Sequence, residues 1–293
     1  MTESCRIRRM TLDDLPLGMR LKEQAGWNQT EADWRRIIAL EPDGCFVAEL
    51  EGRPVGTTCT CRFGPIGWIA MVLVEESARG RGVGTRLMQH GLASLDRGGV
   101  RTARLDATPL GRPLYEKLGF VAEYDLARWE GAAAGGQSSP AVVPAGDCPK
   151  FRPTKLGLSP FEAICELDRR ATGTDRRRLL ERLCQERPDA LRVFAPGGEP
   201  AGYGGSRLGA RAVQLGPIVA PDAAAGAALA DHALAGLAGQ AVFLDVPVDN
   251  RPASRWAESH GLRVQRMLTR MCRGEPVRDR PDRLWACFGP EKG

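Results

Sequence analysis

Apolar residues in the first half of the chain recur with two different periods, which predict alternating helices and strands. In segments 12–21, 31–40 and 83–95 the apolar positions lie three and four residues apart, as on one face of an amphipathic helix. Segment 111–118 predicts a shorter helix, which Gly119 ends. Apolar or alternating runs typical of strands occupy residues 45–49, 55–62, 68–74, 100–106 and 120–129. This order predicts an α/β fold with a mixed sheet flanked by helices.

The second half of the chain repeats features of the first in the same order. In both halves a Pro-Asp pair is followed, over the same separation, by the pattern Gly-x-Pro-x-Gly. These stretches are Pro42–Gly56 and Pro188–Gly202, and Leu105-Asp106 is later echoed by Leu244-Asp245. Residues 132–150 between the halves are rich in alanine, glycine, serine and proline, which is typical of a linker. We therefore predict two domains of one fold, residues 1–131 and 151–293.

Composition and charge narrow the class of protein. Of the 293 residues, 43% are hydrophobic, and none of the apolar runs approaches the length of a membrane helix. The N-terminus lacks the apolar core of a signal peptide, so we expect a cytoplasmic protein. The net charge of +5 comes with dispersed arginines, which argues against a nucleic-acid partner. The nine cysteines and three histidines do not fall at metal-site spacings, so we expect reduced thiols and no metal.

A glycine-rich turn between a predicted strand and a predicted helix has the chemistry of an anion site. Residues 79–85 read Arg-Gly-Arg-Gly-Val-Gly-Thr. The glycines let the backbone approach a ligand closely, and the free N–H groups at the helix start attract phosphate. Arg79 and Arg81 can add charge-assisted hydrogen bonds. The dinucleotide and P-loop patterns do not match, because residue 85 is threonine and no lysine follows.

The pattern R-x-x-G-x-G over Arg79–Gly84 resembles the GNAT superfamily of acetyltransferases. The preceding strand, and Leu114-Tyr115-x-x-x-Gly119-Phe120 downstream, extend the resemblance over roughly residues 5–130. It implies that the fourth strand is bulged and splays from the fifth, with acetyl-CoA in the gap. It also implies direct acetyl transfer to the primary amine of a small molecule. The cofactor-binding residues that it implies are Val72, Val74, Arg79, Gly80, Arg81, Gly82, Val83, Gly84 and Thr85.

The same resemblance suggests one catalytic residue and leaves a second open. Tyr115 matches the tyrosine of the family that donates a hydrogen bond to the CoA sulfur. A free phenol, with a pKa of about 10, is a weaker acid than a thiol, but it can hydrogen-bond a thiolate as charge develops. The general base is not encoded by a motif. Asp106, at the end of a predicted strand, is the first candidate, and Glu23 is the second.

The second half departs from the cofactor pattern. When the halves are aligned by the repeat, Arg79, Gly82, Gly84 and Tyr115 fall on Ala225, Ala228, Ala230 and Ala257. We therefore expect a degenerate domain of the same fold that serves substrate recognition or packing. Two other functions stay open: a non-catalytic acyl-CoA-binding regulator, and a protein-lysine acetyltransferase whose second half docks a protein. Either a monomer or a homodimer is compatible with the sequence.

Overall fold

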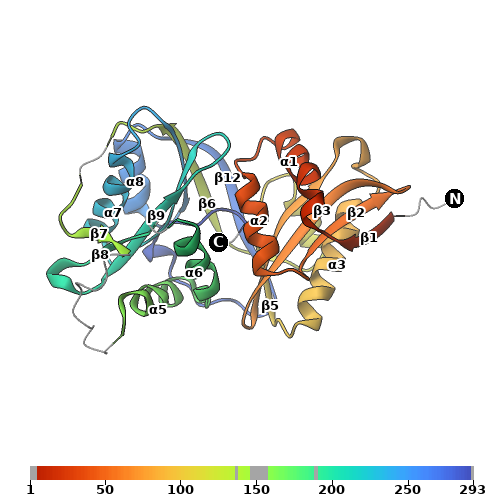
Figure 1. Cartoon of the computed structure of the whole chain (residues 1–293), viewed down its shortest axis with the longest axis horizontal. Helices are drawn as coiled ribbons and strands as arrows, with labels where there is room; N and C mark the ends of the chain where they lie inside the picture. The colour runs from red at the N-terminus through yellow and green to blue at the C-terminus, as the bar shows by residue number, and fades with distance from the viewer. Residues whose placement is uncertain (1–4, 136–137, 146–157, 188–190, 292–293) are drawn as a thin grey trace.

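The computed structural model describes residues 5–135, 138–145, 158–187 and 191–291, as two halves that lie side by side (Figure 1). Residues 136–137 and 146–150 of the predicted linker lie outside the described residues, as do Cys148 and Pro188. The C-terminus lies between the two halves, whereas the N-terminus lies at one end of the molecule (Figure 1).

The first half follows the predicted order of elements. It contains β1 (Cys5–Arg9), α1 (Leu15–Gln24), α2 (Glu31–Leu40), β2 (Cys45–Leu50), β3 (Arg53–Phe63), β4 (Ile66–Val74), α3 (Val83–Arg97), β5 (Thr102–Ala107), α4 (Arg112–Lys117) and β6 (Val121–Ala132). Only β1 was not predicted, because its three arginines hide the strand pattern. The helices cover both faces of the sheet, with α2 and α3 on opposite sides of β3. The predicted mixed sheet flanked by helices is confirmed.

The second half repeats this order. It contains β7 (Val142–Pro144), α5 (Pro160–Thr172), α6 (Arg177–Glu186), β8 (Leu191–Phe194), β9 (Gly202–Arg207), β10 (Val213–Val219), α7 (Ala223–Ala235), β11 (Ala241–Pro247), α8 (Arg251–Ser259), β12 (Arg263–Arg273) and β13 (Leu284–Ala286). Strand β7 lies inside the predicted linker and pairs with β8, so part of the linker belongs to the sheet. The remaining strands and helices match those of the first half one for one, apart from the additional β13.

The two halves exchange their last long strands. All strands but β13 form one path in the order β1-β2-β3-β4-β5-β12-β6-β11-β10-β9-β8-β7. Strand β12 of the second half therefore lies between β5 and β6, and β6 of the first half lies beside β11. Figure 1 shows β6 and β12 side by side where the halves meet. Each half thus depends on the other for a strand of its own sheet.

A pair of equivalent ion pairs fixes this exchange. Asp106 on β5 accepts two hydrogen bonds from Arg270 on β12, at 2.8 and 2.9 Å. Asp245 on β11 accepts two from Arg128 on β6, both at 2.7 Å. All four side chains are buried. Since Arg128 and Arg270 hold the same place on their strands, the duplicated unit keeps this contact in both halves.

Candidate active site

Strand β4 bulges where it separates from β5. Their parallel pairing joins Ile66–Trp68 to Thr102–Arg104 and then stops. Farther along β4, Met71 has a φ of +53°, and the register of β4 against β3 shifts at the same place. The Thr57 hydroxyl donates to the Met71 carbonyl oxygen at 2.8 Å and so holds the bulge. A gap between the two strands follows from this geometry.

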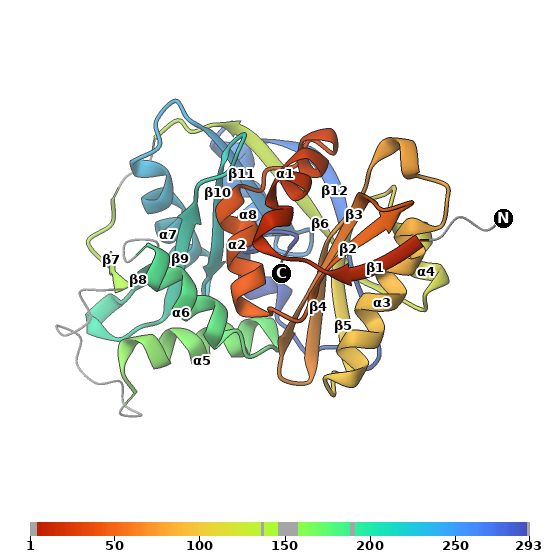
Figure 2. The same ribbon diagram turned by 45° about the vertical axis from the view of Figure 1, so that its right-hand side comes forward.

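The gap is part of a cleft of about 760 Å³ that runs from the glycine-rich turn to the loop after β5. Figure 2 shows β4, β5, α3 and α4 around this region. The cleft brings together ten of the predicted site residues: Val72, Val74, Arg79, Gly80, Gly82, Val83, Gly84, Thr85, Asp106 and Tyr115. Arg81 is exposed and does not contribute to the lining.

The glycine-rich turn has the backbone that an anion site requires. Gly80 and Gly82 have φ values of +76° and +77°, and a Cβ on either would meet open space. Gly82 caps α3, so the first N–H groups of this helix have no intrahelical acceptor, and they belong to residues that line the cleft. The Arg79 side chain turns back onto β4, where its Nε donates to the Val74 carbonyl oxygen at 3.2 Å. The turn thus offers amides and open space beside a cationic side chain.

Tyr115 stands on α4 at the inner end of the cleft. Its side chain is buried, and it packs edge-to-face on Phe120 with ring centroids 6.1 Å apart. Burial raises the pKa of Tyr115 to about 12. The phenol therefore stays protonated at neutral pH and can act as a hydrogen-bond donor.

A second, smaller cavity of about 40 Å³ adjoins the cleft at Tyr115. Six residues line both spaces: Trp27, Val72, Asp106, Thr108, Tyr115 and Arg266. The second half of the chain supplies Arg266 and Leu268 from β12, and Pro290 and Glu291 from the C-terminal segment. None of these four residues was predicted for the site, because only the strand exchange and the course of the C-terminus bring them there.

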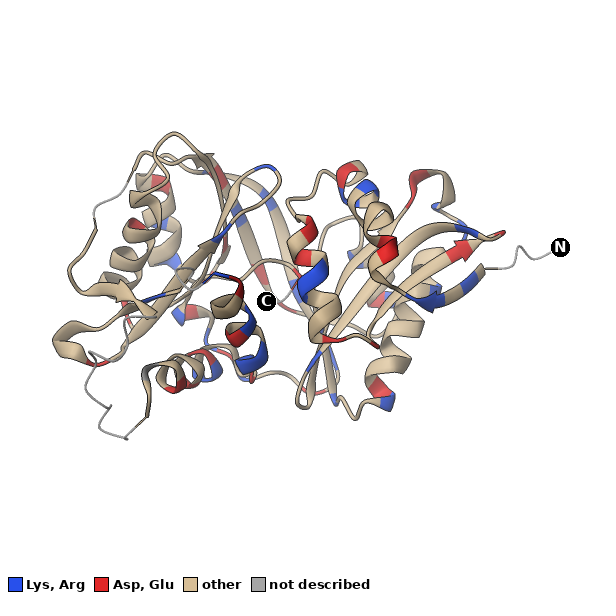
Figure 3. Ribbon diagram, viewed as in Figure 1, with Lys and Arg blue, Asp and Glu red and all other residues tan. Residues whose placement is uncertain are grey.

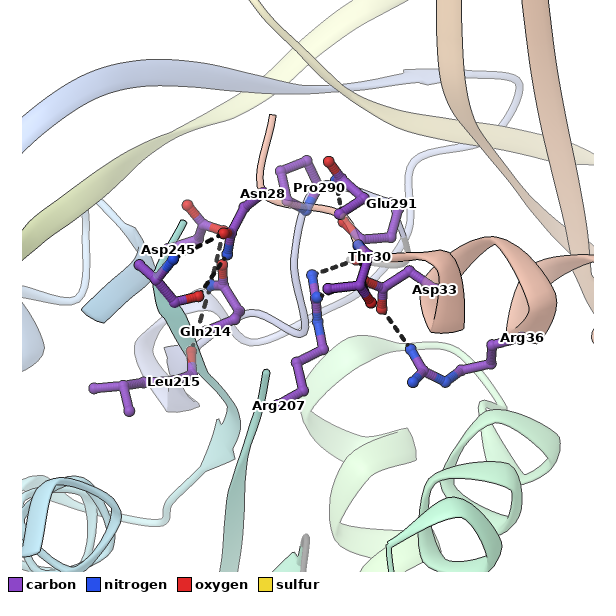
Figure 4. Close-up of polar contacts among 12 residues, drawn as sticks. Asn28, Thr30, Asp33, Arg36, Arg207, Gln214, Leu215, Asp245, Pro290 and Glu291 are labelled. Carbon is purple, nitrogen blue, oxygen red and sulfur yellow. Dashed lines mark hydrogen bonds and ion pairs between the residues drawn. The ribbon is translucent and has the colours of Figure 1, made fainter. Parts of the chain in front are cut away.

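Hydrogen bonds between the halves fix the loop after α1 that lines this cavity (Figure 4). The Asn28 side chain donates to the Ala212 carbonyl oxygen at 3.0 Å and accepts from the backbone N–H groups of Arg211 and Ala212. Beside it, Gln29 Nε2 donates to Glu291 at 3.0 Å. The loop is thus attached both to the β9–β10 connection and to the C-terminal segment.

The C-terminal segment is itself held by the first half. The Trp68 indole N–H donates to the Pro290 carbonyl oxygen at 3.3 Å. Arg207 on β9 bridges Glu291 and Asp33 on α2 (Figure 4), and Arg36 pairs with Asp33 at 2.7 Å. These side chains are buried, so each charge is matched away from water. The wall of the small cavity is therefore a fixed part of the fold.

The two predicted base candidates occupy different surroundings. Both oxygens of Asp106 already accept hydrogen bonds from Arg270, and Asp245 makes the equivalent pair in the other half. This arrangement suits an ion pair that holds the exchanged strand. Glu23 lies on α1 with a side chain that is 68% exposed, and it lines neither cavity. The role of Asp106 as general base stays a prediction, and its ion pair with Arg270 argues against that role.

The equivalent gap in the second half is filled by the chain itself. Strand β13 pairs with the end of β10, and the Cys287 N–H donates to the Asp245 carbonyl oxygen. Trp285 packs so closely on α7 that a Cβ on Gly226 would lie 1.9 Å from its ring. Strand β13 and Cys287 thus occupy the space between β10 and β11 that a pantetheine-like chain would need.

The structure also corrects the alignment of the two halves. Helix α3 begins at Val83 and α7 at Ala223, so the loop before α7 is shorter, and Ala225 lies inside the helix. The counterpart of Gly82 is Asp222, not Ala228. The Asp222 carboxylate accepts from the Ala225 N–H at 2.9 Å and so occupies the helix N-terminus where an anion would bind. This cap, rather than the alanines of the earlier alignment, supports the expectation that the second half lacks the anion site.

Charged side chains of both signs are interspersed along both halves (Figure 3). Within the described ranges, no helix is long and apolar enough to cross a membrane.

Comparisons with known proteins agree with this architecture. A model described as "Acetyltransferase (GNAT) family" matches residues 11–120, and one described as "Acetyltransferase (GNAT) domain" matches residues 164–286. The chain is 24% identical over 241 residues to the uncharacterized N-acetyltransferase YitH of Bacillus subtilis. The aligned region covers 79% of this chain and 78% of YitH.

Two solved structures share the fold over nearly the whole chain. A Pyrococcus horikoshii protein described as an acetyltransferase superposes with a TM-score of 0.82 at 24% identity, covering 99% of this chain and 96% of that one. A tandem GNAT protein from the clavulanic acid biosynthesis pathway superposes with a TM-score of 0.65 at 16% identity, covering 93% and 99%. The chain therefore belongs to the GNAT family of acetyltransferases, in a tandem form with two GNAT domains, and is an acyltransferase enzyme.

Proposed function

We propose that this enzyme uses acetyl-CoA to acetylate the primary amine of a small molecule, by direct transfer in a ternary complex. The observation that carries the proposal is the junction at Tyr115. There, the cleft that leads from the glycine-rich turn meets a small cavity lined by both halves. The two substrates would meet at this junction, one from each side.

The residues of the cleft fit a CoA thioester. Open space above Gly80 and Gly82, together with the N-terminal amides of α3, suits a pyrophosphate. Arg79 would add charge if its side chain turned from Val74 toward the ligand. The bulged strand leaves backbone groups near Val72 and Val74 unpaired with β5, where an extended amide-containing chain can bind.

The chemistry assigned to the site is simple. Acetyl-CoA supplies an acyl thioester, whose C–S bond breaks as the acceptor nitrogen forms the amide bond and loses one proton. Tyr115 donates a hydrogen bond at the sulfur position, because its raised pKa keeps the phenol protonated. We assign the proton leaving nitrogen to water, since the buried acids that line the small cavity, Asp106 and Glu291, are each held by an arginine.

The second half contributes to acceptor binding in this proposal. Arg266, Leu268, Pro290 and Glu291 line the acceptor end, and a cavity of only about 40 Å³ favours a small molecule over a protein lysine. The intact Tyr115 and cleft favour catalysis over acyl-CoA sensing. The assay below distinguishes the proposed enzyme from a protein-lysine acetyltransferase and from an acyl-CoA-binding regulator.

The test is thiol release by the full-length enzyme with acetyl-CoA and a panel of small amines, alongside calorimetric measurement of acetyl-CoA binding. Gly82→Asp should weaken acetyl-CoA about 100-fold, because two like charges some 5 Å apart repel by about 3 kcal/mol at an effective dielectric constant of 20. Gly64→Asp is the matched control, since Gly64 has the same backbone region and open space but lies outside the cleft.

Unchanged acetyl-CoA affinity in a folded Gly82→Asp variant would show that the cofactor site is misplaced. Binding without thiol release on any amine would favour the regulator. Release on a lysine-containing protein alone would favour the protein acetyltransferase.

A further inference from the structure

The charged side chains that line the small cavity differ in whether they are paired. Asp106 pairs with Arg270, and Glu291 pairs with Arg207, which it shares with Asp33. Arg266 is a further cation, and it lines both the small cavity and the cleft. Among the described residues that line the small cavity, Arg266 is therefore the charged side chain without an ion pair.

Within the described residues, Arg266 has no ion-pair partner, and its Nε is buried without a hydrogen bond. Burial, and then the nearby Arg128, lower the pKa of Arg266 to about 10, with Arg211 adding to the effect and Asp245 opposing it. The guanidinium thus stays charged at neutral pH while lacking the partner that a half-buried arginine ordinarily has. A bound anion would satisfy it.

A β-bulge directs Arg266 into the site. On β12, Val264 pairs with Trp129 and Arg266 with Arg128, so that Gln265 is the extra residue. Gln265 is held by Glu130 at 2.6 Å. Beyond the bulge, Leu268 lies two residues from Arg266 and lines the same cavity. The position of Arg266 is therefore fixed by the backbone.

A second unsatisfied polar group lies in the same cavity. Gln29 is only 4% exposed, and its Nε2 donates to Glu291. Because a carboxylate can only accept, this bond fixes the orientation of the amide and leaves Oε1 as an acceptor. Gln29 Oε1 is buried without a partner among the described residues. The cavity is thus lined by one residue with an unpaired cation and one with an unpaired buried acceptor.

We propose that the acceptor is an amino carboxylate, whose carboxylate binds Arg266 and whose amine N–H donates to Gln29 Oε1. This inference rests on the proposed function and adds the substrate class. The cavity of about 40 Å³ exceeds the roughly 10–15 Å³ that a cavity needs to hold one water, so it has room for a small polar group.

The place of Arg266 separates this role from CoA binding. The glycine-rich turn, where phosphate is expected, lines the cleft but not the small cavity, whereas Arg266 lines both beside Tyr115. A loss of Arg266 should therefore change acceptor recognition and leave the affinity for acetyl-CoA nearly unchanged.

The experiment compares kcat/KM for amino carboxylates, including β- and γ-amino acids, with their uncharged carboxamides. The wild-type enzyme should prefer a carboxylate by roughly 10- to 100-fold, as expected for a charge-assisted hydrogen bond. In Arg266→Gln this ratio should fall to about 1 through a higher KM, and Arg266→Lys should restore part of it. Arg263→Gln is the control, because Arg263 lies on the same strand with a side chain that is 83% exposed.

A binding measurement provides a second readout. N-acetylated product acids should raise the Tm of the wild-type enzyme, and their carboxamides should not. Equal kcat/KM for charged and uncharged acceptors in the wild type would overturn the inference and leave the proposed function standing. An Arg266→Gln variant that loses acetyl-CoA affinity instead would assign Arg266 to the cofactor. If acetyl-CoA binds but no amine in the panel is acetylated, both proposals fail.

Discussion

Replacing Asp106 by asparagine distinguishes a structural ion pair from a general base, and Asp245→Asn provides a matched control. Each substitution leaves a buried arginine, Arg270 or Arg128, without its charge partner. Breaking a buried pair in this way costs about 3–5 kcal/mol. At about 2–4 °C per kcal/mol for a chain of this size, the Tm of either variant should fall by roughly 6–20 °C. Loss of a general base would instead lower kcat by about 10²–10⁴.

The assay measures the Tm by circular dichroism and kcat at a temperature where both variants are folded. We expect similar destabilisation in the two variants and a kcat for Asp106→Asn within a few-fold of Asp245→Asn. A double variant, Asp106→Asn with Arg270→Gln, should be less destabilised than the sum of its single changes. The reasoning is refuted if Asp106→Asn keeps its Tm but loses more than about 100-fold in kcat.

Three further predictions follow from the site and the sheet. Tyr115→Phe should lower kcat roughly 10- to 100-fold with little change in acetyl-CoA affinity, because the lost hydrogen bond matters most as negative charge develops on sulfur; full turnover would exclude Tyr115 from the mechanism. Since the pKa of Tyr115 is about 12, half of the phenol is ionised only at about that pH. The pH–rate profile should therefore show no descending limb from Tyr115 below about pH 11. A fragment of residues 1–140 should fail to unfold cooperatively, because it loses β11 and β12 as partners of β6 and β5; cooperative melting with full acetyl-CoA affinity would contradict this.

Local patterns were enough to predict most elements and the place of the glycine-rich turn. Periodicity located α2 and α3, and the glycine-rich turn lies at the start of α3 as predicted. These features depend on residues close together in sequence, where helix period and glycine conformation are encoded directly. Strand β1 was missed because charged residues occupy half-exposed positions on an edge strand.

The acceptor end could not be predicted in this way. Arg266 and Glu291 reach the site through strand exchange and the course of the C-terminal segment, which no local pattern encodes. Asp106 was chosen as a base because it ends a strand, yet its partner Arg270 lies far along the chain. The repeat alignment failed before α7 because a shorter loop shifts the register, and this shift hid the Asp222 cap.

The filled gap in the second half and the wall of the small cavity in the first have a common structural cause. Strand β13 fills the space between β10 and β11, and Trp285 on it packs against α7. The residues that follow β13 then cross to the first half, where Trp68 holds Pro290 and Glu291 borders the small cavity. An open second gap would leave this segment without its anchor, and the acceptor cavity would lose a wall. The second half therefore supports the wall of the small cavity through the same segment that fills its own gap between β10 and β11.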